Sequence, residues 1–326
     1  MKYFLRVLVL VCLLGRAEGA EAPKPFEFIV MGCMPYYLPE DDLRFQHVIQ
    51  EVNKLNPAFS VHCGDTKGGK DPCDDPVYDR VLGYFNSFNG PLVYVPGDNE
   101  WTDCVVKASG SHDPAASLKK IREMFFKAEK SLGKTPIPLV SQRRQPEYQG
   151  YPEHNRWEMG GILLATLHVV GSNNNHMTNN AAAVKEFEAR DKASIAWLRE
   201  AFATAKKQNH RALVLFMQAN PLDELTKTKP RGSGFEQIVP ALKEELLKFD
   251  KPVYLFHSDS HYFRIDKPLL SPTGRTFENF TRVETFGGRN LHLIRVSVEP
   301  QAADPFTVRP WLIEANRVDP SKPMTK

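Results

Sequence analysis

The sequence predicts an α/β fold in which a mainly parallel sheet is joined by a second, stacked sheet. Two patterns lead to this prediction. Short apolar runs alternate with segments of helical periodicity between residues 26 and 256, which is typical of β-α-β units. From residue 262 onward only strand-like runs follow, and these indicate the second sheet. A chain of 326 residues is long enough to bury a substantial core.

The first part of the chain supplies strands and helices in turn. A short apolar run predicts a buried strand, whereas apolar residues three or four places apart predict a helix. Residues 133–157 are rich in Pro, Gln, Arg and Tyr and read as a long surface loop. The expected strands are 26–31, 59–62, 92–95, 161–170, 212–217 and 253–256, and the expected helices are 43–55, 78–88, 118–128, 182–208 and 240–249.

The remainder of the chain predicts a β-rich part at about 262–314. No repeat, low-complexity tract or interdomain linker interrupts the sequence, so we expect one domain over residues 21–326. The expected strands of the β-rich part are 262–265, 281–285, 291–298 and 306–313.

Residues 1–20 have the features of a secretory signal peptide. Lys2 and Arg6 precede an apolar run at 7–14, and small residues suited to cleavage follow at 17–20. The run is far shorter than the roughly 20 residues of a membrane span. A short membrane anchor is the alternative. We therefore expect a secreted or periplasmic protein with no span in the mature chain.

Removal of the signal peptide would take Cys12 with it and leave four cysteines. An exported chain permits disulfides. Cys73 and Cys104 lie in polar, loop-like sequence and are the preferred pair. Cys33 and Cys63 end apolar strands and could be buried thiols, a second bridge or metal ligands.

The overall composition argues against nucleic acid as a partner. The formal charge is only +3, and basic residues do not cluster with aromatic ones. Hydrophobic residues make up 42% and charged residues 25% of the chain, as in soluble globular proteins.

Polar clusters follow directly after five of the expected buried strands. In an α/β sheet, ligands bind in the crevice beyond the carboxyl ends of the strands. Carboxylates and an imidazole meeting there would suit divalent cations. Taken singly, each cluster is more often an ordinary turn, and His261 alone is more often a structural histidine. The clusters are Gly32–Tyr36, Gly64–Lys67, Gly97–Glu100, Gln218–Pro221 and Ser258–His261.

In order and spacing, this series of clusters resembles the calcineurin-like metallophosphoesterase superfamily. That family carries Asp-x-His, Gly-Asp-x-x-Asp, Gly-Asn-His-Asp or -Glu, a later His after a strand, and Gly-His-x-His. The resemblance covers roughly residues 26–270, and the segments 94–101, 261–269 and 281–287 are similar to an uncharacterised secreted branch. It implies a four-layer α/β/β/α sandwich of two mixed sheets flanked by helices. It also implies two metal ions that serve the hydrolysis of phosphate esters.

The first two motifs depart from the family. Cys33 stands where the family has its first Asp, and Pro35 stands where it has the following His. Asp65 keeps the position that bridges both metals in the family, but the second acid of that motif falls at Gly68.

The later motifs depart as well. Asp98 replaces an amide ligand, and Asn99 replaces the histidine that protonates the leaving group. Gln218 is nearest to the missing histidine of the fourth motif. Asp259 replaces the first His of the last motif, whereas His261 keeps the second. Asn99 and His261 are therefore the residues that we assign to catalysis.

The residues that remain predict two divalent metal sites, for Zn, Mn or Fe. Asp65, Asp98 and Asp259 would hold one ion, with Gln218 as a further candidate metal ligand. Asp65, His261 and the Cys33 thiolate would hold the other. A thiolate would favour zinc over magnesium. A structural role of Cys33, packed inward or paired with Cys63, is the alternative that we favour, because buried cysteines are common.

Several further residues are candidates for binding a phosphate ester. Arginine and lysine pair well with phosphate oxygens, although structural ion pairs are the commoner role. The segment 171–174 follows a strand and either lines the cleft or is a polar loop. The candidates are Lys67, Asn173, Asn174 and Arg264.

The sequence thus predicts a secreted metal-dependent phosphoesterase. It would hydrolyse a phosphate mono- or diester by metal-activated water, with a small phosphate ester as its partner. The alternative is a catalytically impaired pseudoenzyme that binds a metal or ligand. The missing first Asp and histidines favour the alternative, whereas the carboxylates retained at the strand ends favour the enzyme.

Overall fold

The computed structural model describes residues 22–226, 232–319 and 321. The expected signal peptide and Cys12 lie outside the described residues. Within the described residues, no helix is both long and apolar enough to cross a membrane.

The first sheet contains five strands in the order β12-β11-β1-β2-β3. The first three strands of the chain are parallel to one another, whereas β11 pairs antiparallel with β1, and β12 pairs antiparallel with β11. The strands are β1 (Phe26–Met31), β2 (Phe59–Cys63), β3 (Leu92–Val95), β11 (Leu293–Val298) and β12 (Phe306–Trp311).

The second sheet contains seven strands in the order β4-β5-β6-β7-β8-β10-β9. Its centre, β6-β7-β8-β10, is parallel, and its two edges are antiparallel. The strands are β4 (Val140–Ser141), β5 (Asn155–Met159), β6 (Ile162–Thr166), β7 (Ala212–Phe216), β8 (Val253–His257), β9 (Arg264–Asp266) and β10 (Phe280–Glu284).

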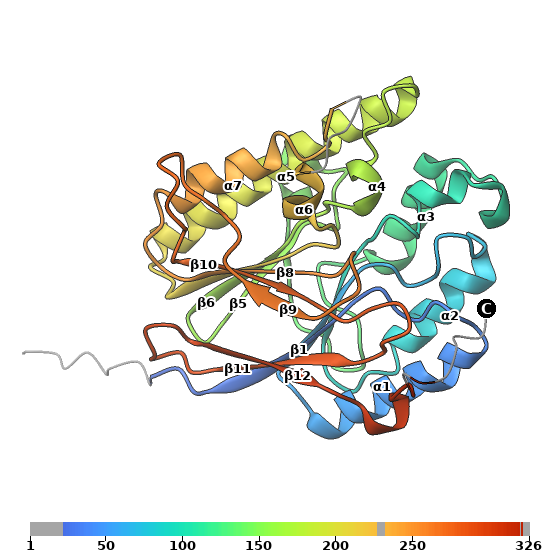
Figure 1. Cartoon of the computed structure of the whole chain (residues 1–326), viewed down its shortest axis with the longest axis horizontal. Coiled ribbons are helices and arrows are strands. Elements are labelled where there is room, and N and C mark those ends of the chain that lie inside the picture. Colours follow the sequence, from blue (N-terminus) through green and yellow to red (C-terminus); the bar gives the residue numbers. More distant parts are fainter. Residues whose placement is uncertain (1–21, 227–231, 320, 322–326) are drawn as a thin grey trace, which may run out of the picture.

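Helices cover the outer face of each sheet (Figure 1). Asp74, Asp113 and Asn180 cap three of them with side-chain oxygens that accept backbone N–H groups. The α-helices are α1 (Glu40–Leu55), α2 (Asp75–Phe85), α3 (Pro114–Phe125), α4 (Gly171–Asn174), α5 (Ala181–Lys207), α6 (Pro221–Thr226) and α7 (Ile238–Leu246). The 3₁₀ turns are η1 (Thr102–Val105), η2 (Lys107–Ser109), η3 (Gln142–Arg144), η4 (Pro146–Tyr148) and η5 (Glu314–Asn316).

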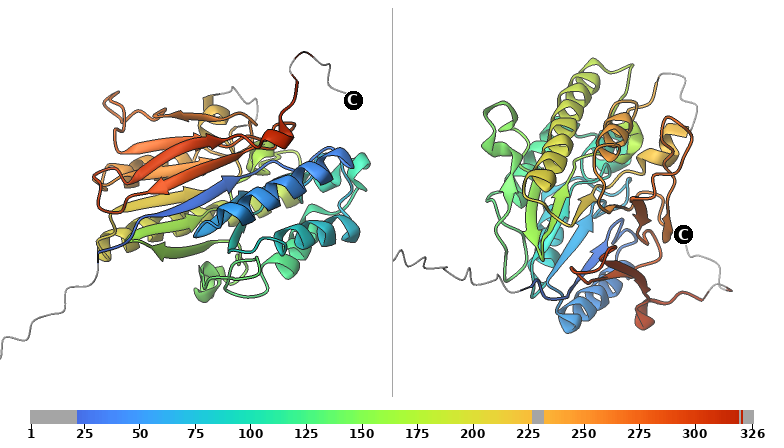
Figure 2. Two further views of the ribbon diagram at one scale, coloured as in Figure 1. Left: turned by 90° about the horizontal axis from the view of Figure 1, so that it is seen from below. Right: turned by 90° about the vertical axis from the view of Figure 1, so that its left-hand side faces the viewer.

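Three apolar layers hold the fold together. Alternate residues of a strand face opposite sides. In β1, Ile29 and Met31 therefore pack towards α1, α2 and α3, whereas Phe28 and Val30 pack between the sheets. A third layer joins the second sheet to α5 and α7. The result is a helix–sheet–sheet–helix sandwich (Figure 2), which confirms the predicted fold class.

The assignment of the C-terminal strands to a second sheet of their own was wrong. β11 and β12 extend the first sheet, whereas β9 and β10 extend the second. The physical reason is that each sheet has an edge at which another strand can form backbone hydrogen bonds. β1 leaves one edge for antiparallel β11, and β8 leaves one edge for parallel β10.

The expected surface loop at 133–157 also needs correction. Its last residues begin β5, and Trp157 of that strand is buried between the sheets. The charged residues Arg156 and Glu158 alternate with the buried ones, as in a strand with one face less buried than the other. Because these two residues are charged, the alternation of buried and exposed residues that marks a strand is not evident from the sequence.

Candidate metal centre

The carboxyl ends of strands from both sheets meet around one cavity. The segments that follow β1, β2, β3 and β8 supply Tyr36, Asp65, Asp98 and Asp259 to its lining. Asn99 and His261 lie in the same wall, and the volume is about 440 Å³. The crevice expected from parallel strand ends is therefore present.

The backbone turns sharply where three of these segments leave their strands. Cys33, Asp65 and His261 have φ values of 52°, 56° and 72°. Left-handed backbone is uncommon for residues other than glycine and is often found at functional sites. At Gly97 a side chain is excluded altogether, since a Cβ atom would lie 2.1 Å from Oδ1 of Asp65.

Three carboxylates form the first cluster. Asp65, Asp98 and Asp259 each offer one oxygen, and these oxygens lie within 4.8 Å of one another. Oδ1 of Asp98 is buried and has no hydrogen-bond partner among the described residues. Burial raises the pKa of Asp98 to about 7, with a further contribution from Asp259. Burial, and then Asp98, raise the pKa of Asp65 well above its usual range. A cation would relieve this repulsion.

Cys33, Asp65 and His261 form the second cluster, with their ligand atoms also within 4.8 Å of one another. Sγ of Cys33 donates to Oδ2 of Asp65 over 3.5 Å. Cys33 is fully buried and its thiol faces Asp65, so this geometry is compatible both with the ligand role and with the structural role that we favour. A bridge to Cys63 is wrong, because both cysteines are free and buried. The two clusters share Asp65.

Tyr36 is a site residue that the sequence analysis missed. Its hydroxyl donates to Oδ2 of Asp65 over 2.9 Å, lies 3.4 Å from Nε2 of His261, and accepts from Nδ2 of Asn99 over 3.3 Å. Its position three residues after Cys33, in a strand-end cluster, was the available signal. The family's motif has no role for a tyrosine at this position, so the resemblance does not predict Tyr36 as a site residue.

Gln218 does not present an oxygen to the metal cluster. Its Nε2 donates to Asp65 over 3.2 Å and to Asp259 over 3.1 Å. Its Oε1 accepts the backbone N–H of Gly171 over 2.6 Å, and this bond fixes the orientation of the amide. Because an amide N–H₂ donates hydrogen bonds and does not ligate metals, the predicted ligand role of Gln218 needs correction.

Asn99 lines the cavity, but other groups hold its amide. Nδ2 donates to the carbonyl oxygen of Lys67 over 3.0 Å and to the hydroxyl of Tyr36. The backbone N–H of Asn99 donates to Oδ1 of Asp65 over 3.2 Å. An amide has no acidic proton to release near neutral pH. Asn99 can therefore orient Asp65 and Tyr36, but it cannot replace an imidazole as a proton donor.

The four candidate substrate ligands do not line this cavity. Buried Lys67 donates from Nζ to the carbonyl oxygens of Gly68 and Asp71. Arg264 pairs with Asp223 and Glu284. Asn173 accepts from the backbone of Gly234, and buried Asn174 accepts from Arg190. Each of the four side chains therefore makes at least one polar contact within the protein, as expected of a structural role.

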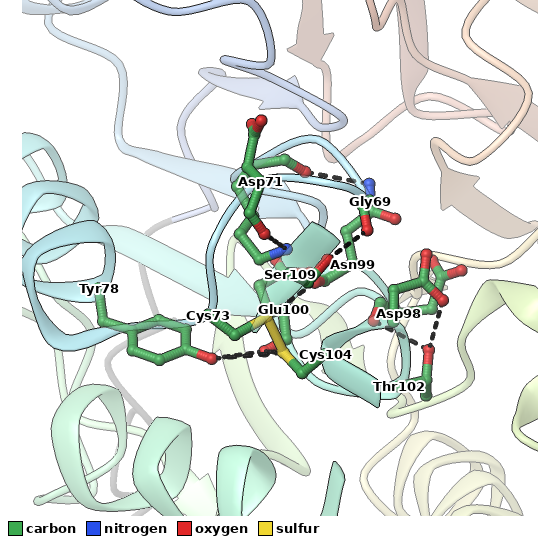
Figure 3. The surroundings of a disulfide bond; sticks show 12 residues. Gly69, Asp71, Cys73, Tyr78, Asp98, Asn99, Glu100, Thr102, Cys104 and Ser109 are labelled. Atoms are coloured by element: carbon green, nitrogen blue, oxygen red, sulfur yellow. Dashed lines mark hydrogen bonds between the residues drawn. A yellow bond between two sulfur atoms is a disulfide. The ribbon is translucent and has the colours of Figure 1, made fainter. Parts of the chain in front are cut away.

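The predicted disulfide between Cys73 and Cys104 is present. It ties the loop that follows Asp65 to the loop that follows Asp98 (Figure 3). Hydrogen bonds flank it, from the hydroxyl of Tyr78 to the carbonyl oxygen of Glu100 and from Ser109 to that of Gly69. The cross-link therefore joins two of the loops that carry the carboxylates.

We expect the double variant Cys73→Ser, Cys104→Ser to be less stable by about 3–4 kcal/mol, from the loss of the constraint on the unfolded chain. The bond closes a loop across a sequence separation of 31 residues. Urea unfolding of both proteins measures the difference. Equal unfolding midpoints and slopes would contradict this expectation.

Comparison with known proteins reveals similarity only at the level of structure. No family model and no curated protein match the chain. A dimetal phosphatase from Danio rerio aligns with a TM-score of 0.51 at 9% identity, over 88% of this chain and 100% of that one. Purple acid phosphatase PPD1 from yellow lupin aligns with a TM-score of 0.51 at 9% identity, over 91% of this chain and 53% of that one. GAP50, the inner membrane complex anchor of Plasmodium, aligns with a TM-score of 0.47 at 11% identity, over 92% of this chain and 99% of that one.

These likenesses concern the fold. Together with the two mixed sheets flanked by helices, the two alignments with a TM-score above 0.5 show that the chain has the calcineurin-like metallophosphoesterase fold. In this fold the two clusters lie at the carboxyl ends of the parallel strands, where such sheets bind ligands.

Proposed function

We propose that this protein is a secreted, divalent-metal-dependent phosphoesterase that acts on small phosphate mono- or diesters. The observation that supports this proposal most is the group of three carboxylates, the buried Asp65 and Asp98 and the partly buried Asp259, whose oxygens lie within 4.8 Å of one another. Two phosphatases of known structure share the fold. We also propose that a signal peptide of residues 1–20 is removed and that residues 21–326 form a single domain. The disulfide is compatible with export.

The donor sets fit divalent cations. An all-carboxylate cluster suits hard ions such as Mn²⁺, and the unpartnered Oδ1 of Asp98 is an available ligand atom. The cluster of Cys33, Asp65 and His261 combines sulfur, oxygen and nitrogen, which suits Zn²⁺ or Fe. Asp65 would contribute to both sites.

When bound, such ions would polarise a phosphate oxygen and lower the pKa of a water molecule. The residues of the chain would orient the reactants. Tyr36 and Gln218 fix Oδ2 of Asp65 by hydrogen bonds. Lys70 is the exposed cation of the cavity lining and would attract the anionic ester. The cavity of about 440 Å³ accommodates a small organic phosphate.

Metal analysis of the purified protein, together with hydrolysis of an aryl phosphate in added Mn²⁺ or Zn²⁺, tests this proposal. We expect bound metal and slow hydrolysis, because loss of a general acid typically lowers the rate by about 10²–10⁴-fold. Aryl phosphates tolerate this loss best, since their leaving groups need little protonation. A folded protein that neither contains nor binds a divalent metal would rule out the proposal.

A second candidate function is a metal- or ligand-binding module without catalysis. The observation in its favour is Asn99, whose amide is committed to Lys67 and Tyr36 and has no acidic proton to give. The same experiment separates the two candidates. Stoichiometric metal without hydrolysis of the aryl phosphate, in a protein of confirmed fold, would support the binding module.

A further inference from the structure

Four consecutive residues beside the metal centre have left-handed backbone. The φ values are 49° at Ser172, 56° at Asn173, 54° at Asn174 and 58° at Asn175. They include most of the segment labelled α4, which is therefore a left-handed turn. Such residues normally occur singly, and Asn tolerates the conformation better than Ser does. A run of four needs support from its surroundings.

Buried partners supply that support. The guanidinium of Arg190 donates to Oδ1 of Asn174 over 2.6 Å and to its carbonyl oxygen over 2.9 Å, and both residues are fully buried. Gly234 donates from its backbone to Oδ1 of Asn173 over 3.0 Å. A Cβ atom at Gly234 would lie 2.2 Å from the carbonyl oxygen of Asn173, so no side chain fits there. The turn is thus held in one conformation by contacts that do not involve a metal ion.

The turn and the preceding Gly171 lie directly against two of the three carboxylates, Asp98 and Asp259. Oγ of Ser172 donates to Oδ2 of Asp98 over 2.7 Å and to Oδ1 of Asp103 over 3.2 Å. A Cβ atom at Gly171 would lie 2.8 Å from Oδ1 of Asp259 and 2.9 Å from both oxygens of Asp98. The N–H of Gly171 also fixes the amide of Gln218. One short segment therefore contacts several groups of the cluster.

The hydroxyl of Ser172 determines which oxygen of Asp98 remains available to a metal ion. Oδ2 accepts from Ser172, whereas Oδ1 is buried without a partner among the described residues. The direction of the Cα–Cβ bond follows the backbone angles. A right-handed conformation at residue 172 would therefore point Oγ elsewhere, and Asp98 would lose this donor.

We propose that Ser172 is a positioning residue for the metal centre. The strained turn 172–175 holds its hydroxyl against Oδ2 of Asp98, so that the carboxylate has a fixed orientation and Oδ1 stays available as a ligand atom before a metal ion arrives. This inference rests on the metal binding in the proposed function. Outer hydrogen-bond partners that orient ligands typically account for about 10–100-fold in metal affinity.

The variant Ser172→Gly tests the role of the hydroxyl. Glycine adopts left-handed backbone freely, so the turn keeps its shape while the donor is lost. We expect Mn²⁺ affinity, measured by calorimetry, to fall about 10–100-fold. The melting temperature of the metal-free protein should not decrease. Loss of affinity without loss of stability is the result that a merely structural serine would not produce.

Two further variants complete the experiment. Ser172→Asn should recover most of the affinity, because Asn tolerates positive φ, its amide can donate to Asp98, and residue 172 is exposed. Asn56→Gly removes the strain of another left-handed residue, with φ of 48° at the end of α1, and should leave Mn²⁺ binding unchanged.

The inference is overturned if Ser172→Gly binds Mn²⁺ as tightly as the wild type does. It is also overturned if Ser172→Asn is as weak as Ser172→Gly, since the donor would then not be the cause. A wild-type protein that binds no Mn²⁺ would instead defeat the proposed function, and this inference with it.

Discussion

Replacing Asp65 with Asn should remove Mn²⁺ and Zn²⁺ binding together, along with any phosphoesterase activity. Asp65 belongs to both clusters, and its carboxylate is the charge that they share. An amide keeps the shape but loses the charge. The loss of affinity should exceed the roughly 10–100-fold that an outer hydrogen-bond partner contributes. Calorimetric titration with each ion, followed by an aryl phosphate assay, measures both effects.

Asp191→Asn is the matched control for this prediction. Asp191 on α5 is also buried, and burial raises its pKa to about 6, but it belongs to neither cluster. We expect this variant to bind both ions like the wild type. If Asp65→Asn retained wild-type metal content and rate while folded, the assignment of two sites that share a carboxylate would be wrong.

Replacing Cys33 with Asp should shift the second cluster from Zn²⁺ towards Mn²⁺ and Mg²⁺. Sγ of Cys33 already faces Asp65, and hard ions prefer carboxylate oxygen to sulfur. The backbone is compatible with the change, since φ is 52° at this position and Asp tolerates left-handed backbone better than most residues. We expect the ratio of Mn²⁺ to Zn²⁺ affinity to rise by about tenfold or more, as measured by parallel titrations.

Cys63→Ala serves as the control for loss of a buried thiol. Cys63 is free and buried in β2, packs between the sheets, and belongs to neither cluster. Its replacement should leave both affinities unchanged. Mn²⁺ binding that is equal to or weaker than that of the wild type in a folded Cys33→Asp protein would exclude residue 33 from the metal centre. The centre would then consist of the three carboxylates alone.

The two clusters connect these predictions with the fold. Asp65 follows β2, Cys33 follows β1 and His261 follows β8, so both sheets must stack as observed for the second cluster to exist. The disulfide ties the loop after Asp98 to the loop after Asp65, and the left-handed turn contacts Asp98 itself.

Local patterns were sufficient to predict most strands and the sheet edge at which the site lies. A buried strand such as β2 is an apolar run in the sequence, and a polar residue directly after it, such as Asp65, must lie at the carboxyl edge. The pairing of Cys73 with Cys104 was predictable because only these two cysteines lie in loop-like sequence. Strand β5 escaped prediction because charged residues lie on its less buried face.

The orientation of side chains around the carboxylates was decided by the tertiary structure. Gln218 presents its nitrogen because Gly171, 47 residues away, binds its oxygen. Tyr36 reaches His261 across 225 residues, and Arg190 and Gly234 hold the left-handed turn of Ser172. Hydrogen bonds between groups so distant in sequence leave no local pattern. The sequence by itself therefore determined which residues stand at the strand ends, and only the packed fold determined which of their atoms face one another.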